Sequence, residues 1–295
     1  MPAYNEEVAL ASELSKIIAF CHQQNWQLII VNDGSKDDTK RVLEEYENES
    51  CLMAIHHKLN RGYGGALKTG ILSVQTQYLA TIDADGQHRL EDVKKLLSEL
   101  EKNDADMVVG NRQNHRSMSW YRGLGTLIIR TVARILVPNT LSDLNSGMKL
   151  YRTDLAKQYL ILCPDSMAFS DVISLIFVNM RHLVLEHPII VNKRLAGHST
   201  IKTRTAIETV IEIFNLLMLF NPLRMLLPVS LIVWLMGTAW GIPILLKGRG
   251  VSVAALLFLL SGVIIFFFGL IAEQLSLMRK ERMAFFNSPQ FPRRG

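Results

Sequence analysis

Two long apolar segments near the C-terminal end constrain this chain more than any other feature. Met225–Leu246 and Val253–Leu275 are almost free of charge, and each is long enough to cross a bilayer as a helix. Only Glu273 carries a charge within them, and it lies close to one end. The intervening Lys247–Ser252 is too short for anything but a tight turn, so we predict two transmembrane helices that form a hairpin. The alternative is a pair of very apolar core helices, but two such runs side by side are rare in soluble folds.

Positive charge is concentrated in the same part of the chain. The formal net charge is +5 at pH 7, while the part from Leu223 onward carries about +6, from eight Lys and Arg against two Glu. The residues before Leu223 are nearly neutral overall, which argues against a nucleic-acid partner. The positive charge of the C-terminal part instead suits anionic lipid headgroups. The positive-inside rule places the basic tail, residues 277–295, in the cytoplasm, and a hairpin then places the N-terminal domain there as well. We therefore expect an integral protein of the cytoplasmic (inner) membrane.

The first 110 residues alternate between predicted strands and helices, joined by connections of a few residues. This rhythm predicts an α/β fold with a mostly parallel, Rossmann-like sheet that is covered by helices on both faces. Pro2–Asn5 has the character of a strand-to-helix loop without its strand, so we expect either a start that lies upstream or a form that lacks the first strand. The predicted strands are Gln27–Val31, Leu52–Ile55, Tyr78–Ile82 and Asp106–Gly110, and the predicted helices include Glu6–Phe20 and Leu90–Lys102.

The rhythm changes after Arg112, although residues 1–204 as a whole are predicted to form one catalytic domain. Residues 205–222 are predicted to form an amphipathic juxtamembrane helix, because Ile207–Phe220 is apolar nearly all round except for an acidic stripe. This helix is too short to span a bilayer, so lying on the membrane surface and packing against the N-terminal domain are equal alternatives. The other predicted elements here are helices Met118–Leu136 and Asp171–Arg181, a strand after the loop that begins at Asp143, and the strand-like Val184–Val191.

The turn Thr81–His88 holds the strongest candidate for chemistry. Asp83 and Asp85 directly follow a short buried strand, and ligands of open α/β sheets bind at the carboxyl ends of strands. Two carboxylates so close together repel each other, so a site that keeps both ionised usually holds a cation. Oxygen ligands suit Mg²⁺ or Mn²⁺ shared with a phosphate. A solvated Asp-rich turn is the alternative for an isolated Asp-x-Asp.

Two further loops fall at carboxyl ends of predicted strands, around Tyr4–Glu6 and at Asp33, so the three loops should face one crevice. Such a crevice could hold a nucleotide, with Asp33 accepting from a base or ribose and the backbone of Pro2–Tyr4 packing against it. The turn Gly62–Gly65 is not a P-loop, because no Gly-Lys-Ser/Thr follows. A close backbone approach and a simple helix start remain equal alternatives for it.

The cysteines and several histidines suggest no site of their own. Cysteine spacing matches no metal or redox motif, as expected in a reducing compartment. The cysteines are Cys21, Cys51 and Cys163, and the histidines that we interpret as surface or loop residues are His56, His57 and His88.

Seven short motifs follow one another in order over roughly residues 1–204. They are Pro2–Glu7, Val31–Ser35, Arg61–Gly70, Asp83–His88, Gly110–Arg112, Ser146–Arg152 and Arg194–Ser199. Together they resemble family-two glycosyltransferases with the GT-A fold, of the dolichyl-phosphate mannose synthase type. The apolar hairpin resembles the anchor of the bacterial branch that makes polyprenyl-phosphate glucose and related lipids. The resemblance implies transfer of a sugar from a UDP- or GDP-sugar to a polyprenyl phosphate, undecaprenyl or dolichyl, and it outweighs the solvated-turn alternative.

Matched by position, the resemblance also implies roles for individual residues. The nucleoside would be held by Pro2, Ala3, Tyr4, Glu6 and Asp33. A Mg²⁺ or Mn²⁺ ion would be surrounded by Asp83, Asp85 and Gln87, with Ala84 between them at the donor site. Phosphates of donor or acceptor would be held by Arg112, Arg194, Ser199 and, on a looser match, Arg122. The expected catalytic residues are Asp85, Arg112, Arg194 and Asp143. Gly86 stands where the family often has a bulkier residue, which should make the turn more mobile.

A polyprenyl phosphate is already an anion at neutral pH, so its oxygen needs no strong general base. Catalysis can then depend on positioning and on charge, and we expect inversion at the anomeric carbon by a single displacement. Asp143 could steer the acceptor or stabilise oxocarbenium charge, with a purely structural role as the equal alternative. Asp171, at a helix start, is interpreted as a cap.

Two other functions remain open from the sequence. A family-two transferase that extends a lipid-linked or polysaccharide glycan is the second enzyme hypothesis, although the short tail provides few helices for a channel. A non-catalytic membrane scaffold is the hypothesis from another class, supported only by the missing first strand. A homo-oligomer is compatible with all three functions.

Overall fold

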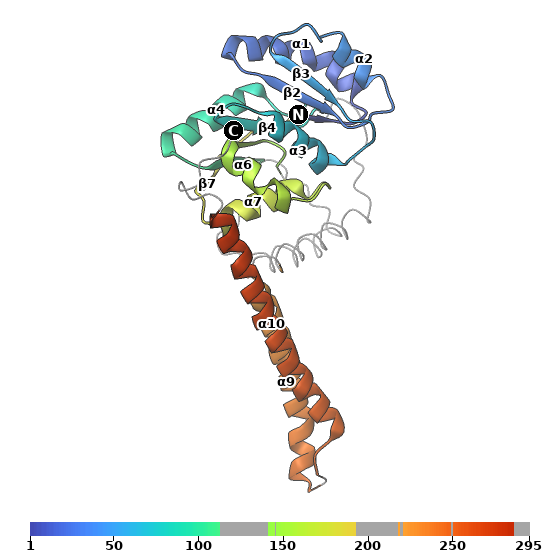
Figure 1. Cartoon of the computed structure of the whole chain (residues 1–295), viewed down its shortest axis with the longest axis vertical. Helices are drawn as coiled ribbons and strands as arrows, with labels where there is room; N and C mark the ends of the chain where they lie inside the picture. Colours follow the sequence, from blue (N-terminus) through green and yellow to red (C-terminus); the bar gives the residue numbers. More distant parts are fainter. Residues whose placement is uncertain (113–140, 145, 193–217, 219–220, 249, 286–295) are drawn as a thin grey trace. The chain divides into compact units, whose positions relative to one another are not determined.

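The structure is a computed structural model that describes residues 1–112, 141–144, 146–192, 218, 221–248 and 250–285. The chain divides into two compact units, Met1–Glu212 and Ile213–Gly295. The first unit is an α/β domain, and the described part of the second unit consists mainly of two long helices (Figure 1).

The N-terminal sheet contains three parallel strands in the order β1-β2-β3. They are β1 (Pro2–Ala3), β2 (Leu28–Asn32) and β3 (Leu52–His56). Strand β1 is present where the sequence indicated a loop without its strand, and it is only two residues long: Val31 N donates to Met1 O and Asp33 N donates to Ala3 O, each over 2.9 Å. Pro2 has no N–H to donate, but its neighbours supply the acceptors for this ladder.

Helices cover both faces of this sheet. On one side, α1 (Glu7–Gln24) and α2 (Thr39–Glu44) share a core with β2, in which Leu10, Leu14, Ile30 and Leu43 are fully buried. The apolar residues of α1 recur at helical spacing, as expected from the sequence. On the other side, α3 (Tyr63–Ser73) packs against β1 and β2 (Figure 1).

The second sheet contains four strands in the order β4-β6-β5-β7. They are β4 (Tyr78–Thr81), β5 (Met107–Asn111), β6 (Lys149–Arg152) and β7 (Val184–Pro188). Strand β6 runs antiparallel to both of its neighbours, whereas β5 and β7 are parallel. Three strand pairs are parallel, β1–β2, β2–β3 and β5–β7, and helices connect the strands, which confirms the α/β class. The sequence pattern did not indicate that β6 runs in the opposite direction.

The second sheet is also covered by helices. Helix α4 (Leu90–Asn103) contacts β5, β6 and β7 and buries Val93, Leu96 and Leu100. The segment after β6 forms α6 (Thr153–Tyr159), the 3₁₀ turn η1 (Leu160–Leu162) and α7 (Phe169–Asn179). Helix α7 begins after Ala168, so the interpretation of Asp171 as its cap is wrong, and Asp171 lies in the first turn instead.

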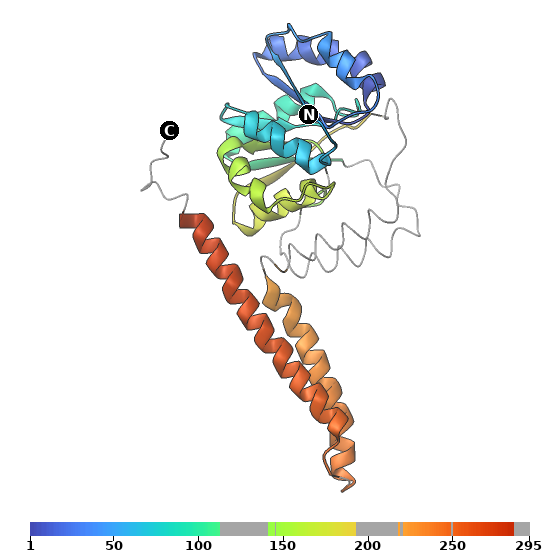
Figure 2. The same ribbon diagram turned by 45° about the vertical axis from the view of Figure 1, so that its right-hand side comes forward.

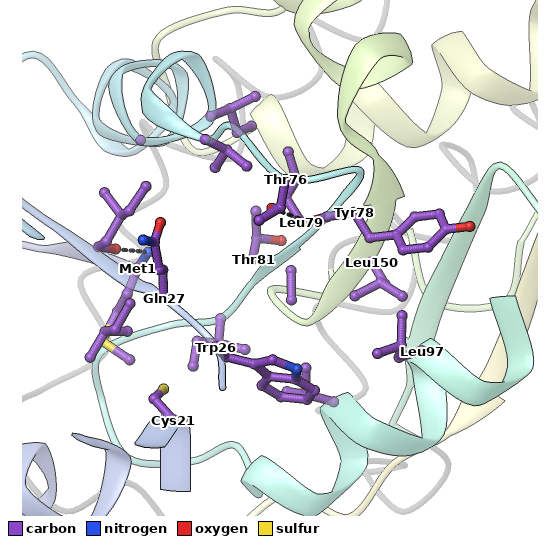
Figure 3. Close-up of a pocket in the computed structure, with 18 of the residues that line it drawn as sticks. Met1, Cys21, Trp26, Gln27, Thr76, Tyr78, Leu79, Thr81, Leu97 and Leu150 are labelled. Carbon is purple, nitrogen blue, oxygen red and sulfur yellow. Dashed lines mark hydrogen bonds between the residues drawn. The ribbon is translucent and has the colours of Figure 1, made fainter. Parts of the chain in front are cut away.

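A mostly apolar cavity of about 620 Å³ lies between the two sheets (Figure 3). Its walls come from the first residues of β2 on one side and from β4 on the other, and they include Trp26, Leu79 and Leu150. The amino group of Met1 reaches into this region and donates to Ile29 O over 2.8 Å. Burial lowers the pKa of this amino group to about 5. Thr81 and Ile82, just before Asp83, also line this cavity, whereas Asp83 and Asp85 do not.

The second unit contains two antiparallel helices, α9 (Pro222–Leu246) and α10 (Val253–Phe285), which lie side by side (Figure 2). Small residues allow their close approach: a Cβ on Gly237 would meet Phe258 Cβ at 3.0 Å, and one on Gly262 would meet Trp234 Cβ at 3.0 Å. Ser230 Oγ donates to Gly262 O across the helix pair over 3.0 Å. Glu273 accepts the N–H of Leu223 in the first turn of α9.

Both helices are long and apolar enough to cross a membrane, and only 11% and 17% of their most apolar windows are buried within the protein. Their bounds contain the two predicted segments, 225–246 and 253–275, and α10 extends farther than predicted. Most of the predicted juxtamembrane helix, 205–222, and the end of the basic tail lie outside the described residues.

Candidate active site

The carboxylate of Asp83, just after β4, contacts one side chain of α3 and one side chain of its own turn. Its Oδ1 accepts a hydrogen bond from the hydroxyl of Tyr63, the first residue of α3, over 2.9 Å. Its Oδ2 lies 3.5 Å from Nε2 of His88. The turn after β4 is therefore held by Tyr63, which the sequence did not connect with it, and by His88 from within the turn.

The electrostatic surroundings keep Asp83 ionised. Burial alone would raise the pKa of this carboxyl, but His88, Tyr63 and the charge of Arg112 together hold the pKa below its ordinary value of 3.8. Burial, together with the negative charge of Asp83, raises the pKa of Tyr63 well above its ordinary value of 10. Tyr63 therefore stays protonated and acts as a hydrogen-bond donor to the carboxylate.

Gly147, immediately before β6, packs directly against Asp83. A Cβ at this position would lie 2.0 Å from Asp83 Oδ2 and 2.6 Å from its Cγ, so any side chain would displace the carboxylate. The carbonyl of Gly147 accepts from Thr81 Oγ1 over 3.1 Å, which ties this loop to the end of β4. The loop before β6 thus forms one wall of the Asp83 turn.

The rest of the turn is closed by local and distant hydrogen bonds. Asp85 is 5% exposed, and its Oδ1 accepts from the N–H of Gln87 over 3.1 Å. Gly86 between them has a φ of +73°, a backbone region that favours glycine. Gln87 is bonded to Asn192 in both directions, because Asn192 N donates to Gln87 O and Gln87 Nε2 donates to Asn192 O. The turn is therefore anchored at both ends.

The donor set of this turn fits a hard divalent ion that is shared with a substrate. Asp83, Asp85 and Gln87 offer oxygen atoms, which Mg²⁺ and Mn²⁺ prefer. Within the described ranges there is no cluster of three or more His, Cys, Asp or Glu that could hold an ion without help. Mg²⁺ is commonly bound in this way, by one or two carboxylates together with substrate phosphates.

Asp33, just after β2, is 2% exposed and accepts hydrogen bonds from the start of the Gly-rich turn. Its Oδ1 accepts from Arg61 N over 2.8 Å and pairs with His57 Nδ1 over 2.7 Å, and its Oδ2 accepts from Gly62 N over 2.8 Å. A carboxylate with these partners is a rigid scaffold for the Gly-rich turn. The predicted contact of Asp33 with a nucleoside stays a prediction.

The loop after β1 is joined to the loop after β2 by reciprocal hydrogen bonds. Asn5 N donates to Ser35 Oγ over 2.9 Å, and Lys36 N donates to Asn5 Oδ1 over 2.8 Å. Tyr4 is 42% exposed at the start of this loop, so its ring is accessible to a ligand. Three other residues predicted for the donor site are partly or fully buried: Pro2, Ala3 and Ala84.

Arg112, after β5, forms a two-pronged ion pair with Asp143. Nε donates to Oδ2 over 2.7 Å, the terminal Nη2 donates to Oδ1 over 2.8 Å, and the backbone N–H of Arg112 also donates to Oδ2. Burial would raise the pKa of Asp143, but the hydrogen bonds and charge of Arg112 hold it below its ordinary value of 3.8. Because Asp143 belongs to the loop that also contains Gly147, one loop contacts both Arg112 and Asp83.

Both interpretations of the Gly-rich turn apply, because α3 begins at Tyr63 and the backbone of the turn closely approaches another segment. Gly64 N and Gly65 N both donate to Asp165 O, and a Cβ on Gly64 would lie 2.2 Å from Pro164 O. Lys68 adds an ion pair to Asp165 over 2.6 Å. In the described part of the chain these glycines therefore contact the loop before α7.

His57 and His88 lie in loops, which is one part of their interpretation as surface or loop residues, but they are not on the surface, since their side chains are only 5% and 6% exposed. His57 bridges Asp33 and Thr69, and His88 faces Asp83, whereas His56 is exposed as expected. Asp83 lies in the same turn as His88, but Asp33 lies 24 residues before His57, a separation that no local pattern spans. Tyr63 was missed for the same reason.

Three of the predicted phosphate-binding residues lie outside the described residues, so nothing is added to their expected roles: Arg122, Arg194 and Ser199.

Comparison with known proteins yields a consistent group of similarities. Residues 1–160, more than half of the chain, match the domain described as glycosyl transferase family 2, and residues 221–278 match the GtrB C-terminal hairpin. A dolichyl-phosphate beta-glucosyltransferase of Dictyostelium discoideum is 30% identical over 177 residues, which cover 54% of each chain. An undecaprenyl-phosphate 4-deoxy-4-formamido-L-arabinose transferase of Proteus mirabilis is 32% identical over 156 residues, which cover 52% of this chain and 47% of the relative.

The chain thus aligns with about half the length of these curated relatives. Among solved structures, glucosyl-3-phosphoglycerate synthase from Mycobacterium tuberculosis, crystallised with Mn²⁺, uridine diphosphate and phosphoglyceric acid, superposes with a TM-score of 0.57. The match is 15% identical and covers 73% of this chain and 76% of the other. At this identity the likeness concerns the fold, which agrees with the predicted GT-A architecture.

Proposed function

We propose that this chain, which belongs to glycosyl transferase family 2, transfers a single sugar from a nucleotide-sugar donor to a polyprenyl phosphate. The observation that carries the proposal is the loop before β6, where Gly147 packs against Asp83 and Asp143 binds Arg112. Carboxylates suited to a metal–diphosphate and a cation suited to a phosphate therefore belong to one site. The names of the matched relatives, which act on dolichyl or undecaprenyl phosphate, support this acceptor class.

In the proposed reaction, an oxygen of the acceptor phosphate attacks the anomeric carbon of the sugar. The bond from that carbon to the diphosphate breaks, and the nucleoside diphosphate leaves with the electron pair. One displacement inverts the anomeric configuration. The attacking phosphate is already an anion, so the site needs to orient it and to stabilise negative charge rather than to remove a proton.

Arg112 is the described residue best suited to hold a phosphate. Asp143 binds its guanidinium through two hydrogen bonds in one plane, which limits the rotation of the guanidinium. The loop before β6 therefore determines where the positive charge of Arg112 lies. Arg122, Arg194 and Ser199 are proposed to complete the phosphate contacts. Asp143 is proposed to act on the reaction through Arg112.

Asp83, Asp85 and Gln87 are proposed to hold Mg²⁺ or Mn²⁺, which would neutralise charge on the departing diphosphate. Asp83 is prepared for this role because Tyr63 orients one of its oxygens and its pKa is held low. The turn around Tyr4 and Glu6 is proposed to hold the nucleoside, with Tyr4 exposed for stacking against the base.

Helices α9 and α10 are proposed to anchor the protein in the cytoplasmic membrane, with the α/β domain and the basic tail on the cytoplasmic side. Their apolar surfaces and the match to the GtrB hairpin support this placement. An acceptor with a long polyprenyl chain stays in the membrane, so anchoring keeps the site within reach of the acceptor phosphate.

The proposal is tested with membranes that contain the full chain, undecaprenyl or dolichyl phosphate, and radiolabelled UDP- and GDP-sugars, with Mg²⁺, Mn²⁺ or EDTA. We expect one donor to label the lipid extract, EDTA to abolish labelling, and Asp85→Asn to reduce it at least roughly a hundredfold. Asp38→Asn, which changes an exposed acid of a surface ion pair, is the matched control and should keep wild-type activity. Absence of labelled lipid with every donor, or full activity of Asp85→Asn, would sink the proposal.

The size of the product separates the proposed reaction from the alternatives. One sugar per lipid is expected, whereas a product that lengthens with time would indicate a transferase that extends a glycan. A protein that only scaffolds other membrane components would label no lipid in purified form.

A further inference from the structure

Lys149 is the first residue of β6, and its side chain is completely buried beside the candidate active site. A buried ammonium group is unfavourable unless hydrogen bonds satisfy its three donors. Its apolar neighbours along the chain, Met148 and Leu150, are 1% and 4% exposed, and their side chains provide no such partner. Hydrogen-bond acceptors for the ammonium group must therefore come from other segments of the chain.

Those partners lie on two different segments. Nζ donates to Leu144 O over 2.8 Å in the loop before β6, and to Ser170 Oγ over 2.7 Å at the start of α7. It also donates to the backbone oxygen of Ser170. Lys149 therefore joins the loop that contains Asp143 to the helix behind it.

The connection extends from Ser170 to both sides of the site. Ser170 Oγ donates to Ser146 O over 2.8 Å, one residue before the glycine that packs against Asp83. On the other side, Ser170 lies near the hydroxyl of Tyr63 and acts to lower the pKa of that hydroxyl, and Tyr63 donates to Asp83. Hydrogen bonds thus lead from the ammonium of Lys149 through Ser170 to Ser146, beside the glycine that packs against Asp83.

Four charged groups surround Lys149 from the packed elements. Burial lowers the pKa of its amino group to about 7, while Asp171 of α7, Asp143 of the loop and Asp83 after β4 favour the charged form, and Arg112 after β5 opposes it. The pKa of Lys149 therefore depends on Asp83 and Asp143, the two acids of the candidate active site.

We propose that Lys149 is a positioning residue for glycosyl transfer, which fixes the placement of Asp83 relative to Arg112 through Ser170 and the loop before β6. This inference rests on the proposed function. Lys149 itself contacts neither donor nor acceptor in this account. Its removal would leave both active-site groups present but would allow the loop between them to shift.

The test uses Lys149→Met, which keeps the length of the side chain without its charge, and Lys149→Arg, which restores a cation. We expect kcat of Lys149→Met to fall roughly tenfold to a hundredfold, as for other residues that orient reactive groups, with KM for the nucleotide sugar changed less than roughly threefold. Lys149→Arg should recover part of this loss. In the wild type, kcat should fall as the pH rises through about 7, where Lys149 loses its proton, and Lys149→Arg should move this fall to higher pH.

Lys157→Met is the matched control, because Lys157 also donates to a backbone oxygen, that of Val74, but lies on α6 away from the acids. Its kcat should equal that of the wild type after correction for folded protein. Equal kcat values and pH profiles for folded Lys149→Met and the wild type would overturn the inference. If Lys149→Met does not fold, Ser170→Ala decides, with a loss of kcat expected and an unchanged kcat contradicting the inference. A wild type without lipid product would instead refute the proposed function.

Discussion

The guanidinium of Arg112 binds the carboxylate of Asp143 through two side-chain hydrogen bonds of 2.7 and 2.8 Å. The two residues are 31 positions apart, and the pair connects the end of β5 with the loop before β6. Because the same loop packs Gly147 against Asp83, the pair determines where a cation lies relative to the candidate metal ligands. The following predictions depend on this arrangement.

Replacing Asp143 by Asn should lower kcat/KM roughly tenfold to a hundredfold, because the guanidinium of Arg112 loses its charged partner while keeping its own charge. The measurement is initial-rate kinetics on detergent-solubilised full chain. The control is Asp38→Asn, which breaks the exposed Arg41–Asp38 pair and should leave the kinetics unchanged. Equal effects of the two variants would show that Asp143 has no special role.

The Asp143 pair should also make stability depend on pH. The pKa of Asp143 is held below 3.8, so its contribution is fully present above pH 3.8 and is lost as the pH falls through the lower folded value. Urea unfolding should show the wild type more stable than Asp143→Asn by roughly 1.5 to 3 kcal/mol at pH 6. The difference should shrink below pH 3.8, and a difference that is constant with pH would contradict the account.

Gly147→Ala should abolish most activity, because the added methyl group would lie 2.0 Å from Asp83 Oδ2 and must move that carboxylate. We expect a loss of kcat of at least roughly a hundredfold, measured together with thermal unfolding. Gly70→Ala is the matched control, since its Cβ would meet only Val31 Cγ2 at an ordinary 3.4 Å. Activity of Gly147→Ala close to that of Gly70→Ala would mean that Asp83 is not needed in its present position.

Gly262→Leu should disrupt the pairing of α9 with α10. A Cβ there would already lie 3.0 Å from Trp234 Cβ and 3.1 Å from Ser230 O, so a larger side chain must separate the helices. Size-exclusion chromatography in mild detergent after heating should show aggregation at a lower temperature than for the wild type. Val263→Leu, on a partly exposed neighbour, should behave like the wild type. Unchanged heat resistance of Gly262→Leu would argue against close packing at this position.

Much of the fold follows from local pattern. The apolar run before Asp83 and the strand before Asp33 are short, β-branched and bounded by polar turns, so their boundaries were predicted within a few residues. The helical hairpin follows from length and composition alone. Strand β6 was not expected to run antiparallel, because direction within a sheet depends on connections far along the chain.

The polar contacts of the candidate site could be predicted only in part. Asp83 and Asp85 are visible because two acids follow a strand, but the partners of Asp83 come from Tyr63 and Gly147, at distances along the chain that no local pattern spans. Lys149 did carry a signal: a lysine within a buried apolar strand needs a specific reason to be there. The two-residue strand β1 was missed because two residues provide no periodicity, and only pairing with β2 defines it.

The central claim is that the chain adds one sugar to a polyprenyl phosphate, and intact mass measurement of the lipid product tests it most directly. Purified full chain is incubated with undecaprenyl phosphate, the active nucleotide sugar and Mg²⁺ or Mn²⁺, and the lipid extract is analysed by mass spectrometry. The account predicts a new lipid heavier than the acceptor by one sugar residue, present with the wild type and missing with Asp85→Asn. An unchanged acceptor, or a series of products that each add a further sugar, would contradict it.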